Sequence, residues 1–107
     1  MFVLVTFVPH AETEKVLSAL FSAGAGGYGK YDHCAFVSSG EGRFRPLEGA
    51  SPFIGVPGKD ERVQEHRIEL LVPDSAVDQT LKALREHHPY EEPAVYLFPM
   101  DERALDH

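Results

Sequence analysis

The sequence is poor in features that mark several common classes of protein. Its one cysteine, Cys34, cannot form an internal disulfide, so nothing in the chain requires an oxidising compartment. No apolar run approaches the roughly 20 residues that a membrane-spanning helix needs. The apolar stretch at residues 2–8 is too short for a secretory signal, and no basic residue precedes it. We therefore expect a cytoplasmic protein with no membrane partner.

Basic residues are also scarce. The 107 residues include 10 lysines and arginines against 17 aspartates and glutamates, which gives a formal net charge of −7 at pH 7. Nucleic-acid binding draws most of its affinity from clustered basic side chains that neutralise phosphates, and the sequence has no such cluster. The charge balance therefore argues against a nucleic-acid partner.

Glycine is absent from both flanks of the chain. All nine glycines lie between positions 24 and 58, whereas residues 1–23 and 59–107 contain none. Because glycine weakens regular elements and permits turns, this distribution predicts helices and strands on either side of a turn-rich centre. The length predicts a single domain, residues 1–107, with a long Gly/Pro-rich connection over about residues 38–61.

The spacing of apolar residues predicts an α+β fold. In chain order, the pattern predicts a strand at 2–8, a helix at 11–23, a strand at 33–38, a short extended segment at 42–45, a strand at 62–72, a helix from 73 to 88 and a strand at 94–100. The order strand, helix, two strands, helix, strand is the βαββαβ arrangement of the ferredoxin-like, or split β-α-β, fold. That fold has an antiparallel sheet with both helices on one face.

The first predicted strand is apolar on both of its faces. One face would carry Phe2, Leu4 and Val8, and the other Val3, Val5 and Phe7. Two helices cover only one face of the sheet, and a solvated outer face alternates with polar residues, which this strand does not. We therefore predict a homo-oligomer in which copies of the chain bury their helix-free faces together.

Two arginines form a candidate anion site. Arg43 and Arg45 are two residues apart in an extended segment with glycines nearby, so both would project from the same side. Guanidinium groups and exposed backbone amides in such a place could hold a phosphate or a carboxylate. Ion pairing with acidic surface residues is the alternative interpretation.

Three histidines and one glutamate form a candidate site for a divalent metal. The possible ligands are His33, His87, His88 and Glu91. None of the common zinc spacings, such as CxxC or HExxH, is present, and Pro89 ends the helix between His87 and Glu91. A purely structural role, with His88 at a helix end and Glu91 in a turn, is the alternative. Association of subunits could still bring ligands together from different copies.

Four segments, taken in order, resemble one known family. They are residues 24–36 (GAGGYGKYDHCAF), 40–46 (GEGRFRP), 52–55 (PFIG) and 88–94 (HPYEEPA). Together they resemble the insert domain of the YqfO-type, Nif3-like family, over about residues 2–100. The resemblance implies a domain similar to PII signalling proteins and CutA, which form trimers around their sheets. The predicted homo-oligomer would then be a trimer.

The resemblance also bears on activity. In the long family members this domain is inserted into a separate domain that carries a dinuclear metal centre and is often described as GTP cyclohydrolase-like. With 107 residues, we expect this chain to stand alone, without space for that metal-binding domain.

Our leading hypothesis is a non-catalytic, oligomeric PII/CutA-like module that binds a small anionic ligand, a metal ion or a partner. The candidate ligand contacts are Tyr31, His33, Arg43, Arg45 and Glu91. One alternative is a metal-dependent hydrolase that uses His33, His87, His88 and Glu91. Another is an interaction scaffold for a separately encoded protein.

Overall fold

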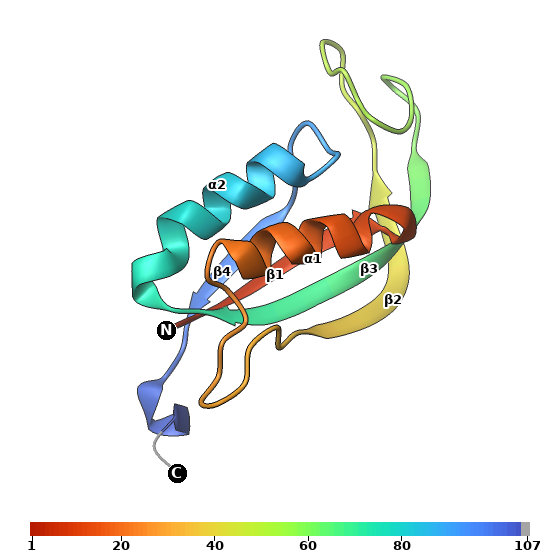
Figure 1. Ribbon diagram of the computed structural model, residues 1–107. Coiled ribbons are helices and arrows are strands. Elements are labelled where there is room, and N and C mark those ends of the chain that lie inside the picture. The colour runs from red at the N-terminus through yellow and green to blue at the C-terminus, as the bar shows by residue number, and fades with distance from the viewer. Residues whose placement is uncertain (106–107) are drawn as a thin grey trace.

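The apolar residues near the N-terminus form an inner strand of a four-stranded antiparallel sheet. The computed structural model describes residues 1–105. Its elements are β1 (Phe2–Pro9), α1 (Thr13–Ser22), β2 (Phe36–Phe44), β3 (Glu61–Val72), α2 (Val77–His87) and β4 (Val95–Pro99), with short 3-10 turns at His10–Glu12, Asp74–Ala76 and Glu102–Leu105. The strand order is β2-β3-β1-β4, and both helices cover the same face (Figure 1). The predicted ferredoxin-like α+β fold is confirmed.

The boundaries of β2 differ from the prediction. Instead of two extended segments at 33–38 and 42–45, one strand pairs with β3 without a break, from Phe36 opposite Glu69 to Phe44 opposite Glu61. The glycines that suggested an interruption lie inside this strand. Their strand propensity is low, but the hydrogen bonds with β3 outweigh it. Residues 33–35 lie in the preceding loop instead.

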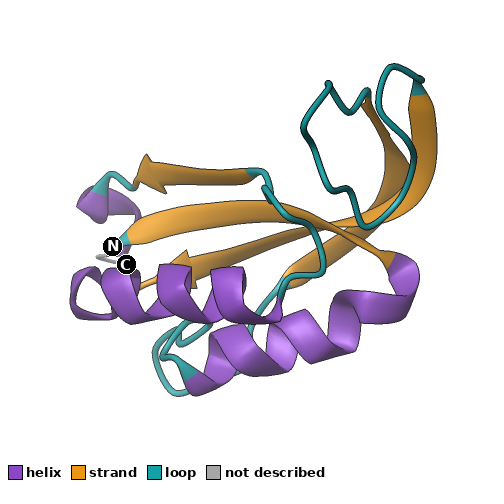
Figure 2. Ribbon diagram, turned by 90° about the horizontal axis from the view of Figure 1, so that it is seen from above, coloured by secondary structure: helices purple, strands orange, loops and turns teal. Residues whose placement is uncertain are grey.

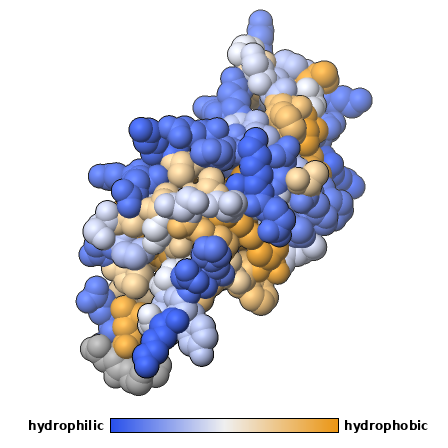
Figure 3. Space-filling model, viewed as in Figure 1, coloured by the Kyte–Doolittle hydropathy of each residue, from blue (hydrophilic) through white to orange (hydrophobic). Residues whose placement is uncertain are grey.

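The hydrophobic core lies between the sheet and the two helices. Leu4 and Ile68 from the sheet are fully buried against Val16 and Leu20 of α1 and Leu84 of α2. Burying side chains of this size stabilises the fold by about 1.5–3 kcal/mol each. The solvent side of this helical layer is predominantly hydrophilic in Figure 3, with apolar atoms visible between the polar side chains. Within residues 1–105, no helix combines the length and the apolar character that spanning a bilayer requires.

The helix-free face of the sheet carries a second group of apolar side chains. Strand pairing places Phe36, Glu69, Val5 and Tyr96 in one row across this face. The exposed or half-buried apolar side chains of the face, here called the outer patch, are Val3, Phe7, Phe36, Leu71, Tyr96 and Phe98. Phe36 remains 66% exposed, Phe98 53% and Tyr96 49%. The expectation that β1 is apolar on both faces is therefore confirmed.

The β2–β3 hairpin extends beyond the rest of the sheet. β1 pairs with β3 only from residue 65 onward, so residues 61–64 of β3 pair with β2 alone. Figure 2 shows that this free end bends away from the helices, together with the loop that joins the two strands. The bent hairpin and the helix-free face thereby form a concave surface, and the candidate site lies in it.

Candidate functional site

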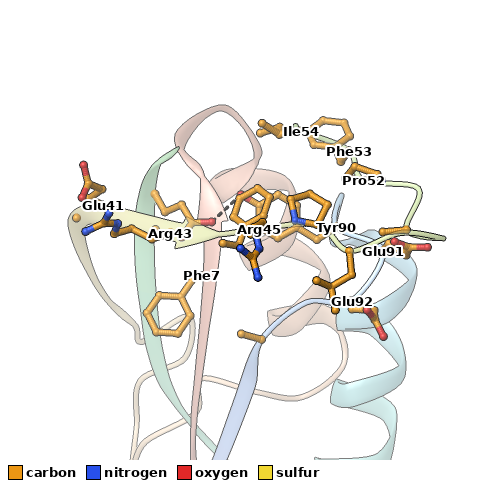
Figure 4. Close-up of a pocket in the computed structure, with 18 of the residues that line it drawn as sticks. Phe7, Glu41, Arg43, Arg45, Pro52, Phe53, Ile54, Tyr90, Glu91 and Glu92 are labelled. Atoms are coloured by element: carbon orange, nitrogen blue, oxygen red, sulfur yellow. Dashed lines mark hydrogen bonds between the residues drawn. The ribbon is translucent and has the colours of Figure 1, made fainter. Parts of the chain in front are cut away.

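A cleft of about 1020 Å³ opens where the bent hairpin meets the segment that follows α2. Its walls come from β2 and the loop after it, from Glu65 and Arg67 in the middle of β3, and from residues 90–96 (Figure 4). Phe7 and Tyr96 line the cleft and also belong to the outer patch, so the two surfaces are continuous. A ligand in the cleft would therefore lie beside whatever covers the patch.

A buried carboxylate forms one wall of the cleft. Glu65 belongs to β3 and is only 7% exposed, and its Oε2 accepts a hydrogen bond of 2.6 Å from the hydroxyl of Tyr90. A Cβ atom at Gly42 would overlap the Glu65 carboxylate, so the glycine on the neighbouring strand leaves the room that this carboxylate occupies. Glu65 is thus accommodated because Gly42 has no side chain, and it is held in place by the hydroxyl of Tyr90 from a distant segment.

Tyr90 stands at the centre of a group of aromatic rings. Its ring centroid lies 6.1 Å from that of Phe44 and 6.4 Å from that of Phe53, with the planes tilted by 53° and 52°. Burial, and next the hydrogen bond to Glu65, raise the pKa of the Tyr90 phenol above its ordinary value of 10.0. The phenol is therefore a neutral hydrogen-bond donor at physiological pH rather than a nucleophile.

His88 fixes the backbone that carries Tyr90 into the cleft. Its Nε2 lies 2.7 Å from the carbonyl oxygen of Phe7, and its Nδ1 accepts a 3.1 Å hydrogen bond from the amide of Tyr90. Both contacts suit the neutral tautomer with the proton on Nε2. Burial lowers the pKa of the His88 imidazole, and the hydrogen bond to the Phe7 carbonyl, with the charges of Glu65 and Glu12, only partly opposes this effect. The predicted structural role of His88 at the helix end matches these contacts.

Glu91 connects the cleft to the long central loop. Its carboxylate accepts a hydrogen bond from the backbone amide of Ser51, at 3.1 Å from Oε2. This contact ties the loop after β2 to the segment after α2 across 40 residues of sequence. It places Phe53 beside Tyr90 and thereby closes one side of the cleft.

The two arginines both line the cleft, but they do not converge. In Figure 4 the side chain of Arg43 lies beside Glu41 at one rim, whereas the guanidinium group of Arg45 lies over the middle of the cleft. Neither arginine forms an ion pair with another residue in the described part of the chain. Their ion pairing with surface carboxylates, the alternative interpretation, is therefore not seen in residues 1–105.

The structure does not bring Tyr31 and His33 to the cleft. Both lie in the loop between α1 and β2, whose Gly26 amide donates to the carbonyl of Leu71, near the opposite end of β3. The His33 ring stacks on Phe21 with centroids 4.6 Å apart, and Tyr31 is 76% exposed. These two predicted ligand contacts are thus separated from Arg43, Arg45 and Glu91 within one chain.

The four candidate metal ligands are also dispersed. His33 stacks on Phe21, and His87 lies on the exposed end of α2 with its Nδ1 2.9 Å from the carbonyl of Ala83. His88 and Glu91 are engaged by backbone groups, as described above. Among residues 1–105, no three His, Cys, Asp or Glu side chains are grouped so that they could hold a metal ion within one chain.

Sequence reasoning missed the centre of the site. Neither Glu65 nor Tyr90 is among the candidate ligand contacts and metal ligands that the sequence suggested, and Tyr90 enters there only within the segment at residues 88–94. The HPYEEP run has a proline on either side of Tyr90 and so indicated a turn of defined backbone conformation after the helix. Nothing in the sequence indicates that this turn contacts Glu65.

Comparison with solved structures first defines the class of fold. The chain aligns with CutA1 from Pyrococcus horikoshii at a TM-score of 0.69 and 20% identity, covering 94% of this chain and 84% of that one. It aligns with the PII-like protein CutA from Nostoc sp. PCC 7120 at a TM-score of 0.71 and 15% identity, covering 97% and 85%. These likenesses establish a CutA/PII-like fold. No protein-family model matches the chain.

Relatives of higher sequence identity then show which proteins the chain resembles. The chain is 46% identical over 100 residues to a protein from Halalkalibacterium halodurans named GTP cyclohydrolase 1 type 2 homolog, covering 94% of this chain and 27% of that protein. A protein of the same name from Bacillus subtilis is 46% identical over 103 residues, covering 96% and 28%. A Bacillus cereus protein related to NIF3 aligns at a TM-score of 0.81 and 44% identity, covering 94% and 25%.

The resemblance to the Nif3-like family is therefore confirmed. The chain spans only about a quarter of the length of these relatives. It is homologous to that one segment of them, and the segment has the CutA/PII-like fold.

Proposed function

We propose that this chain is a non-catalytic binding module that assembles with copies of itself through the outer patch and takes a small ligand in the adjoining cleft. One observation carries the proposal: Phe36, Tyr96 and Phe98 remain about half or more exposed on a face that the helices do not cover. Large exposed apolar surfaces on small domains mark interaction sites. The trimer expected from the family resemblance is the assembly we propose.

Charge supports a second copy of this chain as the occupant of the patch. Arg67 and Glu69 point outward from the centre of the helix-free face, with an Arg67 Nη1 to Glu69 Oε1 distance of 3.8 Å. This pair is neutral, although the whole chain has a formal net charge of −7. Two such faces can meet without net repulsion, and each arginine can approach a glutamate of the other copy.

The composition of the cleft supports binding rather than nucleophilic catalysis. The described residues that line it include no histidine and no cysteine, and Tyr90, one of its two tyrosines, is held as a hydrogen-bond donor. A nucleophile needs a positioned base within hydrogen-bond reach. His88, which contacts Tyr90, has both ring nitrogens engaged by backbone groups.

Sedimentation equilibrium at micromolar concentrations tests the assembly. We expect a mass of three times the chain mass of 11.9 kDa. Phe98→Ser should raise the concentration at the midpoint of assembly by about tenfold or more, because a large apolar side chain buried on assembly contributes more than about 1 kcal/mol. Val56→Ser is the matched control, since Val56 is 56% exposed but lies in the central loop, outside the patch.

The result that contradicts the proposal is equally direct. A wild-type mass of 11.9 kDa at 50 µM (about the concentration at which a weak oligomer would form) would leave the patch uncovered. Equal effects of the two substitutions would show that the patch is not the contact. Circular dichroism of each variant ensures that a change in mass does not reflect unfolding.

A further inference from the structure

The cleft is acidic in spite of its arginines. Five glutamates and three arginines are among the described residues that line it. One of the arginines, Arg67, already has Glu69 as a partner, and Arg43 lies at the rim beside Glu41. Arg45 is left as the basic group over the middle of the cleft. The balance of charge in the cleft therefore favours a cationic ligand over the anion that the two arginines suggested.

The buried carboxylate has capacity for a further donor. Glu65 is more than nine-tenths buried and accepts one hydrogen bond, from Tyr90 to Oε2. Its other oxygen, Oε1, has no hydrogen-bond partner among residues 1–105, and the side chain lines the cleft. An ionised carboxylate that is shielded from water gains most from a charged donor, because the local dielectric constant is low.

The aromatic rings add a surface that suits the same kind of group. Phe44 and Phe53 flank Tyr90 within about 6.5 Å, all three line the cleft, and Tyr90 donates to Glu65. The faces of aromatic rings attract cations, with contributions of about 0.5–1 kcal/mol at exposed sites and more where water is excluded. The Glu65 carboxylate and the three aromatic rings therefore both favour a cationic group.

From this geometry we infer that the cleft binds a small organic cation with an alkylammonium or guanidinium head. The head donates a hydrogen bond to Glu65 Oε1, and its charge lies against the rings of Phe44, Phe53 and Tyr90. Arg45, over the middle of the cleft, faces the remainder of the ligand. This inference rests on the proposed binding function and gives its ligand a chemical class.

A titration with n-butylammonium tests the inference directly. Its neutral isostere, 1-butanol, has the same chain and a hydroxyl in place of the ammonium group. Two-dimensional amide NMR at constant ionic strength should show saturable shifts for Gly42, Phe53 and Tyr90 with the cation. We expect binding of 1-butanol to be at least about tenfold weaker, because it lacks the charge that Glu65 and the rings attract.

Matched variants distinguish the contribution of the buried Glu65 carboxylate to cation binding from that of the overall negative charge of the cleft. Glu65→Gln keeps an acceptor for Tyr90 but removes the charge, and should weaken n-butylammonium binding about tenfold or more. Glu41→Gln removes the same charge at the rim and should weaken binding less than about threefold. Phe53→Leu should weaken it about two- to fivefold.

Three results would overturn the inference. They are equal affinity for n-butylammonium and 1-butanol, equal effects of Glu65→Gln and Glu41→Gln, and saturable binding of inorganic phosphate at these amides without binding of the cation. If Glu65→Gln fails to fold, the comparison of the two probes on the wild type still decides. A wild type that assembles but ignores the cation refutes this inference alone, whereas a monomer that binds nothing refutes the proposed function as well.

Discussion

Replacing Tyr90 by phenylalanine tests the contact on which the cleft depends. The substitution removes one oxygen atom and leaves the ring in place, so that the packing against Phe44 and Phe53 is retained. It also leaves Glu65, which is 7% exposed, without the hydroxyl that lies 2.6 Å from its Oε2. The perturbation is therefore confined to a single hydrogen bond.

The expected cost follows from the charge and the burial of the acceptor. Hydrogen bonds to charged groups contribute about 1.5–3 kcal/mol, and removing one partner leaves the other without compensation. We expect Tyr90→Phe to lower the free energy of unfolding by about 2 kcal/mol at pH 7, or roughly 30-fold in the folding equilibrium. The melting temperature should fall by roughly 8 °C for a domain of this size.

Urea unfolding followed by far-UV circular dichroism measures this loss. All proteins are compared at one concentration, because assembly makes apparent stability depend on concentration. A double-mutant cycle with Glu65→Gln should give a coupling energy of about 1–2 kcal/mol between the two side chains. A loss below about 0.5 kcal/mol, or strictly additive losses, would refute the role that we give to this hydrogen bond.

The pH dependence of the same comparison provides an independent check. The folded-state pKa of Tyr90 is raised above the ordinary value of 10.0, so the folded protein retains a proton that the unfolded chain loses. The stability that this group contributes is thus fully present below pH 10 and is lost as the pH rises above it. The difference between the wild type and Tyr90→Phe should shrink in that range.

Two further predictions concern neighbouring residues. Burial lowers the folded-state pKa of His88 below 6.5, in spite of Glu65 and Glu12. At lower pH the unfolded chain therefore binds a proton that the folded protein does not bind. Wild-type stability should thus fall as the pH drops below about 6.5. His88→Gln should lack this part of the slope in urea unfolding between about pH 5.5 and 7.5 (one pH unit on either side of the ordinary value), and an unchanged slope would contradict the assignment. Gly42→Ala should cost about 1–3 kcal/mol in the same assay, because the added Cβ would overlap the Glu65 carboxylate. Gly40→Ala, which meets open space, should stay within about 0.5 kcal/mol of the wild type, and equal losses for the two would contradict this account.

Much of the fold could be predicted from sequence because each element carries its own periodicity. The alternation that ends at Val72 matches the burial pattern of β3 from residue 67 onward, whereas Glu65 is buried on the other face. The helical stripe that contains Val16 and Leu20 is the buried face of α1. The continuity of β2 could not be predicted in this way. Gly40 and Gly42 lower local strand propensity, and the pairing that overrides them comes from β3, about 25 residues away.

The candidate site was less accessible to sequence reasoning, since it depends on contacts between distant segments. Arg43 and Arg45 were found from their spacing, and both do line the cleft. The rule that alternate residues share a side holds only within a strand, however, and β2 ends at Phe44. The contact of Tyr90 with Glu65 spans 25 residues and two elements, and no local pattern encodes it.

The pairing of β1 with β4 has a consequence for how this fold can be joined to other chains. Phe2 lies opposite Pro99, and the amide of Met100 donates to the carbonyl of Met1 at 3.0 Å. Entry to and exit from the fold are thus neighbouring points at one end of the β1–β4 pair. Two chain segments attached at these points would begin about as close together as the two strands of a hairpin. The whole unit could therefore be inserted into a surface loop of a host protein, or removed from one, without separating the host's two flanking residues.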